Sequence, residues 1–317
     1  MKIAIATDAW QPQVNGVVRS LSTTIDRLRR RGHDVLVVEP GMFRTIPCPT
    51  YPEIRLAIGS GRCVASLLDR VQPDRVHIST EGPIGWATRS WCLKRGRPFT
   101  TAFHTRFPDY VSIRTGLPAE WIWKVMRRFH GPAERTFTAT PSLAAELQAH
   151  GLEHPHYWPR GVELEQFSAN VTPHVGDGPA LEKLARRYPN VSFMGAKHGV
   201  ELASCYAAAD VFVFPSRTDT FGLVNIEALA CGVPVAGYPV PGPLDIIGRD
   251  GRGVHGGHKR IGALDEDLAA AVRLALSGDR GAAIAEARNY SWDRCTDLFE
   301  AGLAGEDHAD PTVRAAA

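Results

Sequence analysis

Two acidic residues, Asp219 and Glu227, stand with seven residues between them around a predicted helix start. They enclose the stretch D-T-F-G-L-V-N-I-E, which leads from a polar turn into an apolar helical run. Gly222 allows close backbone approach, and a helix beginning there presents unpaired N–H groups that attract phosphate or sugar oxygens. A buried Glu227, about one turn later, would accept hydrogen bonds from ribose hydroxyls. The alternative is that Asp219 and Thr220 only cap the helix while Glu227 is an exposed polar residue.

The residues around this stretch predict a strand–loop–helix–strand unit. Residues 211–214 form a short apolar run typical of a buried strand, the helical run ends at Gly232, and residues 233–236 predict the next strand. Ligands of open α/β sheets bind at the carboxyl ends of strands, which is where the loop 215–222 lies.

The first half of the chain shows the same alternation of strands and helices. Its apolar runs predict strands at 3–6, 35–38, 75–78, 99–103 and 136–140. A βαβ opening indicates an α/β, doubly wound parallel sheet. Asn15 and Gly16 precede the first helix, and Glu81 and His104 follow two strands, so we expect them at one edge of the sheet. The structural alternatives are an ordinary Asn-Gly turn and a histidine without a chemical role. Residues 40–61, rich in Pro and Gly, predict a long irregular segment.

Residues 216–236 carry the most specific pattern of the chain. They read S-R-T-D-T-F-G-L-V-N-I-E-A-L-A-C-G-V-P-V-A and resemble the donor-binding signature of retaining glycosyltransferases with the GT-B fold, the glycogen-synthase-like family four. The family pattern is Glu, seven residues, Glu. Asp219 replaces the first Glu, which resembles the branch of GDP-mannose-dependent mannosyltransferases and sulfoquinovosyl-lipid synthases. The resemblance covers most of residues 1–303.

The resemblance implies two Rossmann-like domains and a sugar transfer. Residues 1–165 would form the acceptor-side domain and 166–303 the nucleotide-sugar domain. The helix 291–303 would pack back on the first domain, and 304–317 would be a disordered tail. The implied reaction moves a sugar, with mannose favoured, from a nucleotide-sugar donor to a lipid-linked or glycan acceptor. No metal or other cofactor is implied, because the leaving phosphate itself can take the acceptor's proton.

The resemblance also implies roles for individual residues. His104 would lie beside the transferring sugar and Asp219 at its hydroxyl groups, as the catalytic pair. The implied donor contacts are Gly16, Arg160, Phe221, Gly222, Leu223 and Glu227. The implied acceptor-side residues are Asn15, Glu81 and Arg106.

One segment of the family pattern is missing after Phe167. The family continues there with a strand, then a glycine turn carrying an Arg and a Lys that neutralise the donor diphosphate. Here only residues 168–174 precede V-G-D-G-P. The second domain is therefore expected to be truncated, and losing such a charge typically costs about a hundredfold in rate. Lys197, after an expected strand at 191–194, is a candidate substitute. The alternative function is a catalytically impaired remnant that binds a nucleotide sugar; an epimerase acting on the donor alone has no motif in its favour.

Composition limits the compartment and the partners. The 317 residues are 44% hydrophobic and 22% charged, with a formal net charge of +2, which gives no reason to expect nucleic-acid binding. Basic runs at 27–31 and 124–128 favour solvated helix faces, with peripheral docking on an anionic membrane as the alternative. No signal peptide or membrane-spanning run is recognisable, so we expect a cytoplasmic protein, or one peripheral at the inner face of the membrane.

Cysteine and histidine spacing gives no metal site. We expect Cys92, Cys205 and Cys231, which fall in apolar helical patterns, to be buried free thiols. The pair His255 and His258 lacks a third ligand. The acidic run 265–267 starts a helical pattern, where capping explains it better than metal binding.

Overall fold

The computed structural model describes residues 1–13, 15–48, 51–104, 118–164 and 181–306. The chain divides into two compact units, each with its own sheet. Unit 1 comprises Met1–Pro159 together with the chain from Cys295 onward, and unit 2 comprises Arg160–Arg294.

Unit 1 is built on a sheet of six parallel strands, in the order β2-β1-β5-β6-β7-β8. The strands are β1 (Lys2–Ala6), β2 (Asp34–Val38), β5 (Arg75–Ile78), β6 (Thr100–Phe103), β7 (Arg135–Thr138) and β8 (Pro155–Tyr157). The helices between them are α1 (Gly16–Arg30), α2 (Ser60–Val71), α3 (Pro83–Arg95), α5 (Ala119–His130) and α6 (Pro141–Ala149). Buried apolar strands joined by crossover helices confirm the predicted α/β class.

The expectation of a long irregular segment at 40–61 is wrong. After a 3₁₀ turn at Pro40–Met42, β3 (Thr45–Cys48) and β4 (Tyr51–Ala57) form an antiparallel pair. Arg55 also donates a hydrogen bond from Nε to the Thr45 hydroxyl at 3.1 Å. The prolines of this stretch are tolerated because an isolated two-stranded ribbon leaves one side of each strand unpaired.

The C-terminal helix α13 (Trp292–Ala304) belongs to the core of unit 1 from Cys295 onward. Phe299 is fully buried, and its ring centroid lies 4.9 Å from both the His77 and Trp158 rings. The Nε atom of Arg75 donates a hydrogen bond to the carbonyl of Leu303 at 2.8 Å. The end of the chain therefore covers one face of the sheet that its beginning forms.

Unit 2 contains a smaller parallel sheet with the order β11-β10-β9. Its elements are β9 (Phe212–Phe214), β10 (Val235–Gly237), β11 (Gly262–Leu264), α7 (Leu181–Arg187), α8 (Gly199–Ala207), α9 (Leu223–Ala230), α10 (Pro243–Ile247), α11 (Leu268–Ala275) and α12 (Arg280–Ala287). Within the described residues no strand pairs with the outer edge of β9. Val213 is accordingly 39% exposed, although β10 beside it is buried.

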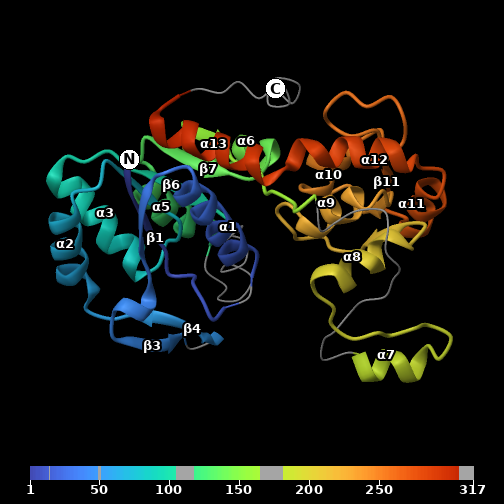
Figure 1. Cartoon of the computed structure of the whole chain (residues 1–317), viewed down its shortest axis with the longest axis horizontal. Helices are drawn as coiled ribbons and strands as arrows, with labels where there is room; N and C mark the ends of the chain where they lie inside the picture. Colours follow the sequence, from blue (N-terminus) through green and yellow to red (C-terminus); the bar gives the residue numbers. More distant parts are fainter. Residues whose placement is uncertain (14, 49–50, 105–117, 165–180, 307–317) are drawn as a thin grey trace. The chain divides into compact units, whose positions relative to one another are not determined.

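The region before α8 differs most from expectation. The strand predicted at 191–194 does not form, and Val191 and Met194 are 54% and 45% exposed. The helix α7 has no buried residue and stands apart from the three-stranded sheet of its own unit (Figure 1). A short apolar run becomes a strand only when a neighbouring strand or helix covers it.

The cysteine and capping predictions hold in part. Cys92 and Cys231 are buried free thiols, and burial raises the pKa of each thiol to about 12. Cys205 is only partly buried, which corrects its assignment, and Cys295 is a buried cysteine that the pattern did not indicate. Asp267 caps α11 by accepting hydrogen bonds from the first-turn amides, so capping explains the acidic run.

Candidate functional site

The loop between β9 and α9 lies at the carboxyl end of its strand, as predicted. Gly222 is the N-cap residue of α9, with φ of +79°, a conformation that L side chains rarely adopt. A Cβ atom there would lie 2.4 Å from Nδ2 of Asn225. Only glycine therefore fits this position. Phe221, beside it, is buried, with its ring centroid 6.0 Å from that of Tyr290.

Asp219 closes this loop on itself. Its Oδ1 atom accepts hydrogen bonds from the N–H groups of Phe221, at 3.0 Å, and Gly222, at 2.8 Å. Two of the three amides expected to bind the donor are thus bonded to Asp219. The third belongs to Leu223, the first residue of α9, where a helix has no internal acceptor for its N–H. The Asp219 residue itself is exposed, so its carboxylate remains accessible.

Glu227 lies in α9 and is only 2% exposed. The exposed surface position considered for it is therefore wrong. The hydroxyl of Tyr206, on α8, donates to Oε2 of Glu227 at 3.3 Å. Removing a carboxylate from water is costly, so the burial of Glu227 next to this loop agrees with the predicted ribose contact, which stays a prediction. Sequence reasoning found Glu227 by its spacing, but it missed Tyr206.

The two candidate cations of unit 2 differ in environment. Lys197 does not follow a strand, which corrects the basis of its assignment, and its Nζ atom lies 3.4 Å from Oε2 of Glu201. Its charge is therefore already paired on the surface. Arg160, the first residue of unit 2, is buried, with 7% of its surface exposed.

The candidates of unit 1 at its first helix have a clear structural role. Asn15 caps α1, because its Oδ1 accepts hydrogen bonds from the amides of Val17 and Val18, each at 3.0 Å. Gly16 is the first residue of that helix and is exposed. The Asn-Gly pair therefore forms a capped helix start, and a ligand contact for it stays a prediction.

Glu81 and His104 follow the neighbouring strands β5 and β6 at the carboxyl edge of the sheet. Oε1 of Glu81 lies 3.3 Å from Nε2 of His130, which is itself buried. His104 is partly exposed, and its ring centroid lies 6.0 Å from that of Trp158, edge to face. Arg106 lies outside the described residues.

Asp8 is a buried carboxylate at the same edge that sequence reasoning missed. It follows β1, and it accepts hydrogen bonds from the amides of Ile84, at 3.0 Å, and Gly85, at 3.3 Å, in the first turn of α3. The Thr80 hydroxyl also donates to it, at 3.0 Å. Burial raises the pKa of Asp8, although these hydrogen bonds oppose the shift. An acidic residue directly after the first strand was the available signal.

We expect Asp8→Ala to lower the free energy of unfolding by about 2–4 kcal/mol, because two buried amides of α3 lose their acceptor. The raised pKa means that the folded protein binds this proton more tightly than the unfolded chain. The contribution of Asp8 to stability is therefore largest below its unfolded pKa, near 3.8, and declines as pH rises through the folded pKa. Urea unfolding at several pH values measures this. A loss in the variant that is equal at all pH values would contradict the assignment.

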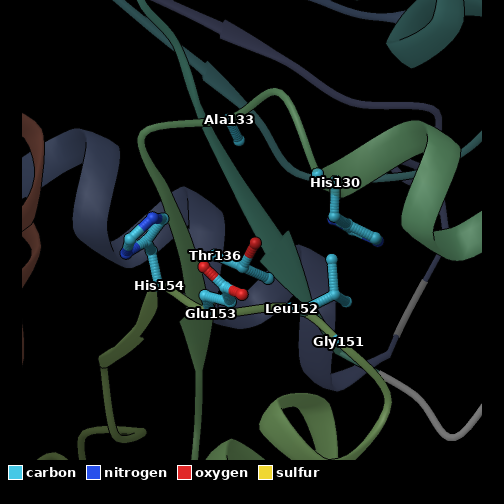
Figure 2. Close-up of a pocket in the computed structure, with 8 residues that line it drawn as sticks. His130, Ala133, Thr136, Gly151, Leu152, Glu153 and His154 are labelled. Carbon is cyan, nitrogen blue, oxygen red and sulfur yellow. The ribbon is translucent and has the colours of Figure 1, made fainter.

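Two cavities of unit 1 lie away from these residues. Figure 2 shows the smaller, of about 120 Å³, whose lining includes His130, Thr136, Leu152, Glu153 and His154. The larger, of about 490 Å³, adjoins Arg135. Both lie mainly beside the loops that precede β7 and β8, at the amino ends of the strands. The smaller is well below the roughly 300–1,000 Å³ of ordinary ligand pockets. No predicted site residue lines either cavity.

Across the described ranges, no three His, Cys, Asp or Glu side chains are grouped closely enough to hold a metal ion. None of the helices in those ranges is both long enough and apolar enough to cross a bilayer.

Comparison with protein families gives two adjoining matches. The family described as Glycosyltransferase Family 4 matches residues 14–166, and the one described as Glycosyl transferases group 1 matches residues 166–277. Similar proteins include a GDP-mannose-dependent alpha-mannosyltransferase of Mycobacterium tuberculosis, 27% identical, with 78% of this chain and 81% of the relative covered. The Arabidopsis thaliana sulfoquinovosyl transferase SQD2 is also 27% identical, with 89% of this chain and 69% of the relative covered.

A third relative bears on the missing segment. The GDP-mannose-dependent alpha-mannosyltransferase of Corynebacterium glutamicum is 27% identical over 368 aligned positions, which cover 95% of this chain and 88% of the relative. The alignment is longer than the whole 317-residue chain. The relative must therefore contain internal residues that have no counterpart here.

Solved structures show the fold. Sucrose-phosphate synthase of Thermosynechococcus elongatus superimposes with a TM-score of 0.70 at 17% identity, covering 96% of this chain and all of that one. Anabaena Alr3699/HepE, solved in complex with UDP-glucose, gives a TM-score of 0.64 at 14% identity, with 96% and 99% covered.

Proposed function

The chain belongs to the GT-B-fold glycosyltransferases that use nucleotide-sugar donors, and we propose that it transfers mannose from GDP-mannose to a lipid-linked or glycan acceptor, with retention of configuration. The choice of mannose is supported by the relatives named as GDP-mannose-dependent mannosyltransferases.

The observation that carries the proposal is the buried Glu227 behind a loop whose shape only glycine permits. In the proposed complex, Glu227 accepts hydrogen bonds from the ribose hydroxyls. Asp219 contacts hydroxyl groups of the transferred sugar, and the first-turn amides of α9 face the sugar or phosphate. Such a helix start favours anionic and oxygen-rich groups.

Unit 1 is proposed to supply the remaining groups. His104 would position or polarise the transferring sugar, and Glu81, Asn15 and Arg106 would lie on the acceptor side. Gly16 would approach the diphosphate, where a side chain would obstruct the backbone. No metal ion takes part in the proposed reaction, because the departing phosphate accepts the proton of the attacking hydroxyl.

A second candidate function, a binding remnant with little turnover, is favoured by a specific observation. Relatives carry internal residues that this chain lacks, the described sheet of unit 2 has an open edge at β9, and Lys197 is paired with Glu201. If no other cation meets the diphosphate, the leaving group is poorly stabilised and transfer is slow.

Donor-dependent thermal stabilisation and nucleotide release test both candidates. A ligand that binds only the folded protein stabilises it by about 2.7 kcal/mol at a hundred times its Kd. We therefore expect GDP-mannose, as the proposed donor, to raise the melting temperature more than UDP-glucose at the same concentration. With a lipid or glycan acceptor present, GDP should then be released. Stabilisation without release would favour the remnant. No stabilisation by any nucleotide sugar would contradict both.

A lipid-linked acceptor requires contact with a membrane, and we propose that α5 provides it. Trp121 and Val125 are 65% and 47% exposed, while Lys124 and Arg128 beside them are also exposed. Positions one turn apart share one helix face, and the opposite face of α5 is buried in the core. Tryptophan favours the interface of a bilayer, and basic side chains attract anionic lipid headgroups.

Vesicle sedimentation tests this surface. We expect the protein to bind vesicles containing phosphatidylglycerol and not vesicles of phosphatidylcholine alone. The double variant Lys124→Gln and Arg128→Gln, or Trp121→Gln, should weaken binding roughly tenfold or more. Lys94→Gln, at an exposed position on α3, is the matched control. Equal binding by the control and the α5 variants would exclude this face.

A further inference from the structure

Asn225 is the one buried side chain of α9 whose polar atoms the sequence pattern did not explain. It is 0% exposed, and among the residues that the structure describes neither its Oδ1 nor its Nδ2 atom has a hydrogen-bond partner. Buried amides of this kind are rare, because a polar group removed from water without a partner destabilises the folded state. The free protein therefore keeps Asn225 for something other than its stability.

The position of Asn225 in the helix shows which partner it lacks. It is the third residue of α9 after the N-cap Gly222, the position from which a side chain commonly reaches back to accept the N-cap N–H. Its amide is already close, since a Cβ on Gly222 would meet Nδ2 at 2.4 Å. That N–H, however, is donated to Oδ1 of Asp219 at 2.8 Å. Asp219 and Asn225 thus compete for one donor, and Asp219 holds it.

We propose that Asn225 is a positioning residue that takes over the Gly222 N–H when the Asp219 carboxylate turns to the sugar of the donor. This inference rests on the proposed function, which places Asp219 at the sugar hydroxyls. A half-turn of the Asn225 amide exchanges Nδ2 for Oδ1 next to Gly222. The Gly222 N–H then keeps an acceptor. The Phe221 N–H, which also bonds to Oδ1 of Asp219, becomes available to the sugar or phosphate of the donor, and the released carboxylate accepts from the sugar hydroxyl groups.

The exchange would connect the unpaired Asn225 amide of the ligand-free protein with a preference for the nucleotide sugar over the free nucleotide. Without Asn225, turning Asp219 toward the donor would leave a buried amide of the loop unsatisfied, which opposes binding of the sugar roughly tenfold or more. A nucleoside diphosphate has no sugar hydroxyls at that position and does not draw Asp219 away. Asn225 should therefore matter for the nucleotide sugar and not for the free nucleotide.

The test replaces Asn225 with leucine, which has a similar volume and no polar atom. We expect Asn225→Leu to raise the melting temperature of the ligand-free protein, because two unpaired polar atoms are removed. We also expect it to weaken GDP-mannose binding about tenfold and to leave GDP binding unchanged, as measured by calorimetry. Asn225→Ala, measured in parallel, removes the amide without adding the bulk of leucine, so it distinguishes loss of the amide from a packing effect. Asn225→Asp keeps an acceptor oxygen and should restore donor binding in part.

The outcomes separate this inference from the function on which it rests. If the wild type binds no nucleotide sugar, the proposed function is wrong. The role of Asn225 is then overturned with it, whatever the melting temperatures of the variants are. If the wild type binds GDP-mannose but both the leucine and alanine variants bind it equally well, only the role of Asn225 is overturned. Equal weakening of GDP and GDP-mannose would also overturn it, since that result indicates a general packing role.

Discussion

Replacing Glu227 with glutamine is expected to weaken binding of the nucleotide-sugar donor about a hundredfold. Glutamine has nearly the same shape and still offers an oxygen to the Tyr206 hydroxyl, so the fold of α9 should be kept. The change removes the charge that would strengthen two hydrogen bonds from ribose, each of which contributes about 1.5–3 kcal/mol when one partner is ionised. Calorimetric titration with GDP-mannose and with GDP measures the loss, which should be similar for both because both carry the ribose.

The matched control is Glu182→Gln, which removes an exposed carboxylate from the same unit. It should leave the affinity for both ligands within about twofold. Full donor affinity in the Glu227 variant would show that this buried carboxylate does not contact ribose, and the donor site would then have to be sought elsewhere.

Replacing Phe299 with alanine is expected to lower the free energy of unfolding by about 3–5 kcal/mol, the usual cost of removing a fully buried phenylalanine ring. Its ring contacts His77, Phe137 and Trp158, so the cavity would open in the middle of the core of unit 1. Chemical denaturation followed by tryptophan fluorescence measures the loss. Leu93→Ala, at a 47% exposed position on α3, should change stability by less than about 1 kcal/mol. A small effect at Phe299 would mean that α13 contributes little to unit 1.

The alternation of apolar runs predicted five of the six strands in the sheet of unit 1, because each of these five is a largely buried segment with a strong pattern, and it missed the short edge strand β8, Pro155–Tyr157. The ribbon β3–β4 was missed because its prolines are atypical of strands, and they are tolerated only at unpaired edges. The strand expected at 191–194 was wrong for a related reason. Its residues suit a strand, but local pattern cannot supply the neighbour that a strand needs.

In the candidate site, the spacing of residues predicted positions well where the backbone conformation restricts the residue type, as at Gly222. The pattern predicted Gly222 at the helix start and left both a buried and an exposed position open for Glu227, and the structure places Gly222 at the N-cap and Glu227 in the buried interior. The alternative that Asp219 caps the helix start anticipated that its carboxylate binds backbone amides there, but the pattern could not show which amides it binds. Asp8 was missed because its partners, the amides of Ile84 and Gly85, lie far away in the chain. Asn225 was missed because a sequence shows neither its burial nor that the nearby Gly222 N–H is bonded to Asp219.

The open side of β9 has a consequence for how firmly the donor loop is anchored. In the described part of the chain, β9 is hydrogen-bonded to a strand on one side only, and the loop that carries Asp219 continues directly from its end. Backbone amides on such a border exchange with deuterated water through small local openings. Binding of a nucleotide sugar to this loop should therefore slow hydrogen exchange of the backbone amides of β9. The bound ligand would then stabilise the edge of the second sheet that no strand covers in the described part of the chain.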